Sequence, residues 1–189
     1  TDKLEGSREF GQAEMKKAGM VVLPHKDFSD FNLAIKFLKK NSGRYVFKPN
    51  YGVGEGLDLH DLLFLGQEED GKDILEMLET NKKLLKSKIK SFQLQQFALG
   101  VEMAVGAFFN GQDFIYPINV NFEHKRLFPG ELGPFTGEMG TLCYWSQPNT
   151  VFNETLAKMR GDLKKSGYAG YIDINCIVNG RGIYPLEIT

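Results

Sequence analysis

The sequence lacks the features that mark secreted, membrane-spanning or nucleic-acid-binding proteins. It has only two cysteines, Cys143 and Cys176, and they lie too far apart to form a C-x-x-C metal or redox motif. No apolar run approaches the roughly 20 residues of a membrane span, and no basic segment precedes an apolar one as in a secretory signal. The formal net charge of −1 gives no electrostatic reason to expect nucleic acid as a partner. We therefore expect reduced, buried thiols in a cytoplasmic protein.

The composition and the spacing of apolar residues predict a mixed α+β fold. Hydrophobic residues make up 42% and charged residues 25%, enough for a packed core. Apolar spacing predicts helices over residues 7–18, 28–40, 74–89 and 152–163. Strands are predicted over residues 20–23, 44–48, 92–97, 101–109, 114–120, 169–178 and 183–188, with a long loop over 121–146. A boundary near Gly100 would divide the chain into lobes 1–99 and 100–189, with a nucleotide between them.

The last two predicted strands bring two carboxylates together. A three-residue loop over residues 179–181 keeps the apolar sides of both strands on one face. In that register Asp173 lies directly opposite Glu187, and two adjacent carboxylates repel unless a cation such as Mg²⁺ lies between them. Two alternatives remain open: the acids form a solvated edge, or a two-residue loop places them on opposite faces.

Two further features suit a nucleotide but are weak by themselves. Lys48 ends an apolar strand just before a glycine-rich segment, Gly52-Val53-Gly54-Glu55-Gly56, whose N–H groups could approach phosphate oxygens. Glu102 begins the next strand, where a carboxylate could accept hydrogen bonds from ribose hydroxyls. The alternatives are a flexible surface loop and an ordinary surface acid.

The order of these segments resembles the ATP-grasp superfamily, and within it the phosphoribosylamine–glycine ligase family. Residues 5–10, EGSREF, resemble the E-G-S-K-x-F opening of that family, and residues 45–48, YVFK, resemble its lysine-bearing strand. Residues 95–102, QQFALGVE, resemble E-E-F-L-x-G-E-E, and residues 124–126, HKR, resemble the end of D-H-K-R. Residues 133–140, GPFTGEMG, resemble G-P-N-T-G-G-M-G, and residues 186–189, LEIT, resemble L-E-F-N.

The resemblance implies an ATP-grasp fold whose two α+β lobes clasp ATP with Mg²⁺ or Mn²⁺. It implies a reaction of de novo purine biosynthesis in which ATP activates an amino acid such as glycine as an acyl phosphate, and an amine such as phosphoribosylamine attacks it. The implied metal ligands are Asp173, Glu187 and Thr189. The implied ATP contacts are Arg8, Lys48, Gly54, Gly56, Gln95, Gln96, Phe97, Ala98 and Glu102. Among them, Lys48 and Arg8 would hold phosphate oxygens, backbone donors of residues 96–98 would read adenine, and Glu102 would bind the ribose. The implied substrate contacts are His124, Lys125, Arg126, Gly133, Pro134, Thr136 and Gly137, with Arg126 and Lys48 in catalytic roles.

Several residues depart from the family pattern. Gly54-Glu55-Gly56 stands where the family usually has G-K-G, Arg8 replaces a lysine, Gln95 and Gln96 replace two acids, and Thr189 replaces an asparagine metal ligand. These changes leave two alternatives open: a ligase for a different acid and amine, or an ATP-binding module without catalysis. Both ends of the chain look cut, so adjacent domains of the same polypeptide are expected.

Overall fold

The computed structural model describes residues 2–52 and 62–189, which form two compact units. One unit, here called unit 1, contains the residues up to Leu23 together with Leu99–Thr189, and unit 2 contains Pro24–Ala98. The predicted boundary near residue 100 is present, but the prediction that residues 1–23 belong to the first lobe is wrong. Met15 and Met20 are buried in the core of unit 1, and their burial holds this segment there. No helix in the described residues is long and apolar enough to cross a membrane.

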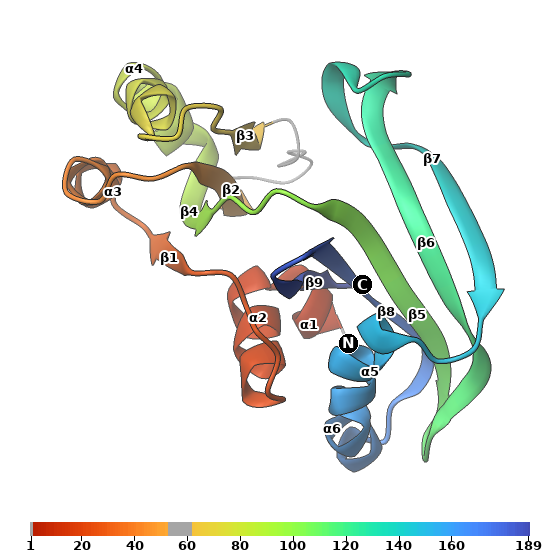
Figure 1. Ribbon diagram of the computed structural model, residues 1–189. Helices are drawn as coiled ribbons and strands as arrows, with labels where there is room; N and C mark the ends of the chain where they lie inside the picture. The colour runs from red at the N-terminus through yellow and green to blue at the C-terminus, as the bar shows by residue number, and fades with distance from the viewer. Residues whose placement is uncertain (1, 53–61) are drawn as a thin grey trace. The chain divides into compact units, whose positions relative to one another are not determined.

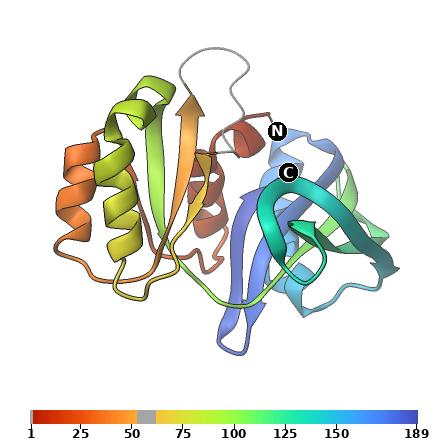
Figure 2. The ribbon, with the colours of Figure 1, turned by 90° about the horizontal axis from the view of Figure 1, so that it is seen from above.

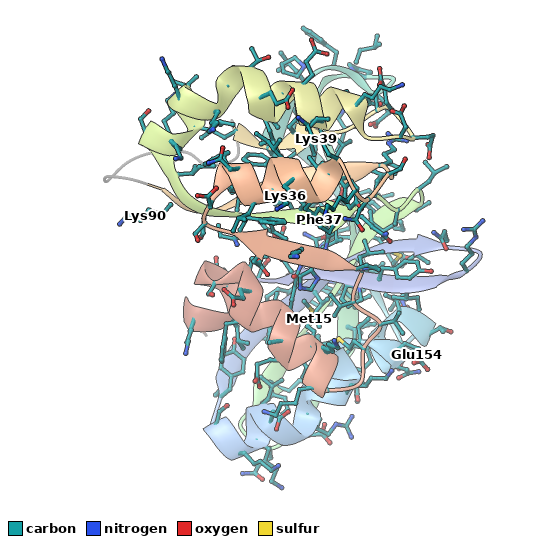
Figure 3. All side chains as sticks on the ribbon, turned by 90° about the vertical axis from the view of Figure 1, so that its left-hand side faces the viewer. Met15, Lys36, Phe37, Lys39, Lys90 and Glu154 are labelled. Atoms are coloured by element: carbon teal, nitrogen blue, oxygen red, sulfur yellow. The ribbon has the colours of Figure 1, made fainter. Side chains whose placement is uncertain are left out.

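Unit 2 is an antiparallel sheet with two helices against it. The sheet has the order β1-β4-β2-β3, and its strands are β1 (His25–Phe28), β4 (Ile89–Gln96), β2 (Tyr45–Gly52) and β3 (Phe64–Leu65). Helices α3 (Phe31–Leu38) and α4 (Lys72–Lys88) lie side by side (Figure 2). Their apolar sides form one core with the sheet residues Phe47, Phe92 and Leu94. Lys36 of α3 and Lys39, which directly follows this helix, are exposed (Figure 3).

Local signals in the sequence set the ends of several helices. Asp30 begins α3 because its carboxylate accepts hydrogen bonds from the N–H groups of Asn32 and Leu33, at 2.6 and 3.2 Å. Ser7 caps α2 (Arg8–Lys17) in the same way, and Asn149 caps α5 (Thr150–Glu154). Gly167 ends α6 (Arg160–Ser166) with a φ of 68°, a left-handed conformation that glycine adopts easily.

Unit 1 is built on a five-stranded antiparallel sheet of order β7-β6-β5-β8-β9 (Figure 1). Its strands are β5 (Val101–Asn110), β6 (Phe114–Phe128), β7 (Leu132–Ser146), β8 (Ala169–Asn179) and β9 (Gly182–Ile188). The helical elements are α1 (Asp2–Gly6), α2, α5, the 3₁₀ helix η2 (Leu156–Met159) and α6. Met15 of α2, labelled in Figure 3, is fully buried with Phe152 and Leu156 against the apolar side of this sheet.

Three of the predicted elements differ from the structure, and one of them is the helix expected over residues 152–163, which is divided into α5, η2 and α6. Residues 20–23 form no strand, and β1 instead covers His25–Phe28, where a helix was expected to begin. The predicted loop over residues 121–146 is wrong, because β6 and β7 continue through it as a long antiparallel ribbon. Apolar and polar residues alternate in β6 only from Ile118 to Glu123, and the polar run over residues 124–126 and the glycines of β7 hide the rest of the ribbon from a periodicity argument.

Candidate functional site

The sheet of unit 1 has one apolar face and one polar face. Val105, Ile174 and Val120 lie on the buried side, packed with the helices. Residues that are directly opposite in the register share a face, and successive residues alternate between faces. The register therefore gathers polar side chains from four strands on the other side, which we call the polar face. Its members are Glu102, Asn119, Asn121, Glu123, Lys125, Tyr171, Asp173, Asn175 and Glu187, together with Thr189 just beyond β9.

The β8–β9 hairpin has a different register from the predicted one. Asn179 pairs with Gly182, so the loop has two residues rather than three, and Glu187 lies opposite Asn175, not Asp173. The register shifts between Asn175 and Cys176, where β9 carries one extra residue, Leu186. This β-bulge reverses the alternation once, so Asp173 and Glu187 still share the polar face. The prediction of direct pairing is wrong, and the prediction of a common face is confirmed.

The carboxyl group of Asp173 has a raised pKa. Burial raises the pKa of its carboxyl group, and the negative charges of Glu123 and Glu187 raise it further, to about 6, while hydrogen bonds from Thr189 and Tyr171 act in the opposite direction. The backbone groups of Asp173 and Thr189 bond to each other at 2.9 and 3.1 Å. Thr189 is therefore the residue directly opposite Asp173, and its hydroxyl lies beside that carboxylate.

The polar face offers oxygen ligands of the kind that hard cations prefer. Asp173 and Glu187 supply carboxylates, Thr189 supplies a hydroxyl, and the buried amide oxygen of Asn175 has no hydrogen-bond partner among the described residues. Arg8 donates to Glu187 Oε2 at 2.9 Å, so the residue predicted to contact phosphate is bonded to a predicted metal ligand. No group of three or more His, Cys, Asp and Glu side chains within residues 2–52 and 62–189 is arranged to hold a metal. A Mg²⁺ ion would fit only with neutral oxygen ligands beside the acids.

Lys125 forms ion pairs with Glu102, the residue predicted to bind the ribose, and with Glu123. Its ammonium group lies 2.6 Å from Glu102 Oε1 and 3.3 Å from Glu123 Oε2. Burial lowers the pKa of Lys125, but the attraction of Glu102 and Glu123 and the hydrogen bond to Glu102 outweigh it, so the pKa is raised above 10.5. Lys125 therefore acts as a fixed cation between the two acids within unit 1.

The other predicted substrate contacts hold the β6–β7 ribbon together. Arg126 donates to the carbonyl of Gly133 at 2.8 Å, and the hydroxyl of Thr136 donates to the carbonyl of Lys125 at 2.9 Å. His124 lies 3.2 Å from the carbonyl of Phe128 and 3.4 Å from Glu131. Gly133 has a φ of 83°, and a side chain there would meet the ring of Phe128 at 2.9 Å. Pro134 is exposed, and the backbone of Gly137 belongs to β7.

Unit 2 carries the other predicted ATP contacts. Lys48 is buried on β2 directly opposite Gln93 of β4. The amide of Gln93 donates to Asp27 of β1 at 3.1 Å, so a polar row crosses three strands of this sheet. Sequence reasoning missed Asp27 and Gln93, although the alternation of residues 92–95, Phe-Gln-Leu-Gln, indicates a polar side. Gly54 and Gly56 lie outside the described residues.

The segment predicted to read adenine, residues 95–98, begins with the last two residues of β4. Gln95 is buried, and its Nε2 has no hydrogen-bond partner within the described parts of the chain. The N–H of Gln96 donates to the carbonyl of Pro24 at 2.8 Å, and that of Phe97 donates to the carbonyl of Arg44 at 2.9 Å. Backbone donors over residues 96–98 were expected to face adenine, but those of Gln96 and Phe97 are bound within unit 2. The Arg44 guanidinium also stacks 3.6 Å from the centre of the Phe97 ring.

The fold is that of the ATP-grasp enzymes. A D-alanine–D-alanine ligase from Bacillus anthracis, solved in complex with ATP, superposes with a TM-score of 0.59 over 98% of this chain and 56% of its own, at 16% sequence identity. A phosphoribosylamine–glycine ligase from Thermotoga maritima superposes with a TM-score of 0.72 at 26% identity, over 99% of this chain and 48% of its own.

The sequence defines the family more narrowly. The family model described as "Phosphoribosylglycinamide synthetase, ATP-grasp (A) domain" matches residues 6–180, and the chain belongs to this family. The phosphoribosylamine–glycine ligase of Streptococcus pneumoniae strain R6 is 30% identical over 193 residues, which cover 98% of this chain and 44% of the relative. That of Listeria monocytogenes strain F2365 is 28% identical over 194 residues, which cover 97% and 44%. The chain thus spans less than half the length of these relatives.

Proposed function

We propose that this chain is the ATP-binding core of a carboxylate–amine ligase of the phosphoribosylamine–glycine ligase type, which acts through an acyl phosphate in purine biosynthesis. The observation that carries the proposal is the polar face, where Asp173, Glu187 and Thr189 come together in a chain of this family. Cys176 is buried as expected, whereas Cys143 is exposed, so the expectation of burial is wrong for Cys143; both thiols are free, which suits the reducing cytoplasm in which we place the reaction.

The proposed chemistry has two steps. A carboxylate oxygen of the amino acid attacks the γ-phosphorus of ATP, and the bond to ADP breaks. The nitrogen of the amine then attacks the acyl carbon, inorganic phosphate leaves with the former carboxylate oxygen, and the nitrogen loses a proton to solvent. The protein orients the reactants and offsets negative charge.

Residues of both units have parts in this scheme. Asp173, Glu187 and Thr189 would hold Mg²⁺, which when bound neutralises charge on the phosphates. Lys48 and Arg8 would bind phosphate oxygens, and Arg8 would have to share its guanidinium with Glu187. Glu102 would accept hydrogen bonds from the ribose, and Arg126 would bind the anionic substrate or the acyl phosphate. Adjacent domains of the same polypeptide would complete the acceptor site, since the chain covers 44% of its relatives.

Calorimetric titration of the folded chain with ATP, in the presence and absence of Mg²⁺, tests the proposal. We expect heat of binding that depends on Mg²⁺, and a weaker signal for Asp173→Asn. The absence of any heat from a chain with native circular dichroism would falsify it.

Thr189 favours a second candidate, an ATP-binding module without catalysis, because a threonine hydroxyl is a weaker metal ligand than the amide oxygen of asparagine. The full-length protein decides between the candidates. ADP release with glycine and phosphoribosylamine supports the ligase, release only with other acids and amines supports a ligase of different specificity, and binding without turnover supports the module.

A further inference from the structure

Asn175 lies among the predicted metal ligands but had no part in the prediction. It is directly opposite Glu187 in the β8–β9 register, two residues from Asp173 on the same face of β8. Thr189 lies opposite Asp173, so the four side chains form a two-by-two block on neighbouring strands. Only 6% of Asn175 is exposed, which makes it the most buried of these four residues.

The hydrogen bonds of Asn175 identify which amide atom lacks a partner. Its Nδ2 donates to Glu123 Oε1 at 3.3 Å. An ionised carboxylate can only accept, so the reversed amide would set two acceptors against each other. The remaining atom is therefore Oδ1, a buried acceptor for which residues 2–52 and 62–189 supply no donor. A buried carbonyl oxygen in this state costs free energy unless a donor or a cation reaches it.

The nearby protein cations are bonded elsewhere. Nη1 of Arg8 donates to Glu187, while its Nε is buried without a partner among the described residues and does not bond to Asn175 Oδ1, and the ammonium of Lys125 lies against Glu102 and Glu123. The other groups of the block are oxygens, and the Thr189 side chain is bonded to Asp173. An amide oxygen that shares one face of two neighbouring strands with two carboxylates and a hydroxyl contributes to a ligand set of the kind that hard divalent cations prefer.

We propose that Asn175 Oδ1 is a direct ligand of the divalent cation held by Asp173 and Glu187. This inference rests on the proposed function, and it adds a ligand to the predicted set. Asparagine is the residue that the family resemblance implies at position 189, where this chain has threonine. In this chain the neutral amide oxygen would thus come from Asn175 of β8, opposite Glu187, and not from position 189 after β9.

Manganese titration of the full chain with saturating ADP, followed by electron paramagnetic resonance, tests the proposal without requiring turnover. We expect Asn175→Ala to weaken Mn²⁺ binding by about tenfold or more. Asn121→Ala is the matched control: its Oδ1 is also buried without a partner and it lies on the same face, but β5 separates it from β8. The control should stay within about twofold of the unchanged chain. The double variant Asn175→Ala/Thr189→Asn should recover the lost affinity.

Asn175→Asp separates metal binding from the contact with Glu123. It keeps an oxygen ligand and removes the Nδ2 donor, so it should bind Mn²⁺ at least as tightly as the unchanged chain. Normal Mn²⁺ binding by folded Asn175→Ala overturns the inference, as does equal loss in Asn121→Ala or in Asn175→Asp. If the unchanged chain binds neither ADP nor Mn²⁺, the proposed function itself fails. If all variants bind Mn²⁺ normally, only the role of Asn175 fails.

Discussion

Replacing Lys125 with methionine should destabilise unit 1, because it removes the cation shared by two carboxylates. Lys125, Glu102 and Glu123 have side chains that are 22%, 30% and 17% exposed, so water screens them only partly. Removing one partner of a fully buried pair costs about 3–5 kcal/mol, whereas exposed pairs contribute about 0–1 kcal/mol. For these intermediate exposures we expect Lys125→Met to lower the free energy of unfolding by about 2 kcal/mol.

The pH dependence gives the same prediction a second test. The pKa of Lys125 is raised above 10.5 in the folded chain, so the folded state holds this proton more tightly than the unfolded state. The contribution of Lys125 is therefore complete below pH 10.5 and is lost as the pH rises through the folded pKa. The stability difference between the unchanged chain and Lys125→Met should be constant from pH 7 to 9 and should shrink above pH 10.5.

Urea denaturation followed by tryptophan fluorescence measures the effect in the relevant unit. Trp145 is the single tryptophan, and it lies on β7 of unit 1. Lys165→Met is the matched control, because Lys165 is 81% exposed and lies 3.9 Å from Asp162. The control should change stability by about 0.5 kcal/mol or less. If Lys125→Met costs no more than Lys165→Met, the ion pairs of Lys125 do not stabilise unit 1 and the reasoning is refuted.

Three further predictions concern the same unit. Gly106→Ala should destabilise it by about 2 kcal/mol in urea denaturation, because the new Cβ would lie 2.7 Å from Asp173 Cβ, whereas Gly140→Ala has nothing within 4 Å and should be nearly neutral. Because the folded pKa of Asp173 is raised from its ordinary value of 3.8 to about 6, its ionisation does not destabilise the fold below pH 3.8, and the cost grows from pH 3.8 to 6 and is complete above pH 6. In EDTA, Asp173→Asn should therefore be more stable than the unchanged chain by about 2 kcal/mol at pH 7. At pH 4 the two should be equally stable. Cys143 is exposed and burial raises the pKa of Cys176 to about 12, so a thiol reagent should label one cysteine in the native chain and two in urea; native labelling that survives Cys143→Ser would contradict this.

Periodicity in the sequence was sufficient to predict most strands and helices of both units. It failed where glycine interrupts the pattern, as in β7, which contains Gly133, Gly137 and Gly140. It also failed where a short strand carries mostly polar residues, as in β1. The packing of α2 with the strands after residue 99 depends on contacts across more than 80 residues of chain, and a local pattern contains no information about it.

The sequence motifs were sufficient to predict the family, but they contain no information about the contacts of their residues in the fold. Lys125 was predicted to bind substrate because of its place in residues 124–126, and its bonds to Glu102 and Glu123 could not be read from that motif. Asn175 was missed because no motif contains it. Its signal was the alternation of β8, which places Asp173 and Asn175 on one side and Ile172, Ile174 and Cys176 on the other.

The β8–β9 hairpin shows why the sheet face on which Glu187 lies can be predicted more safely than the residue directly opposite it. A two-residue loop without a bulge would place Glu187 on the apolar face opposite Ile174 and would turn Ile188 toward the polar face. Burying that acid and exposing Ile188, which is only 3% exposed, costs more than one unpaired residue in an edge strand. The extra residue at Leu186 therefore follows from the burial pattern, which selects the face of Glu187 whatever the length of the loop. The length of the loop and the place of the bulge decide only which residue of β8 lies opposite, and here that residue is Asn175.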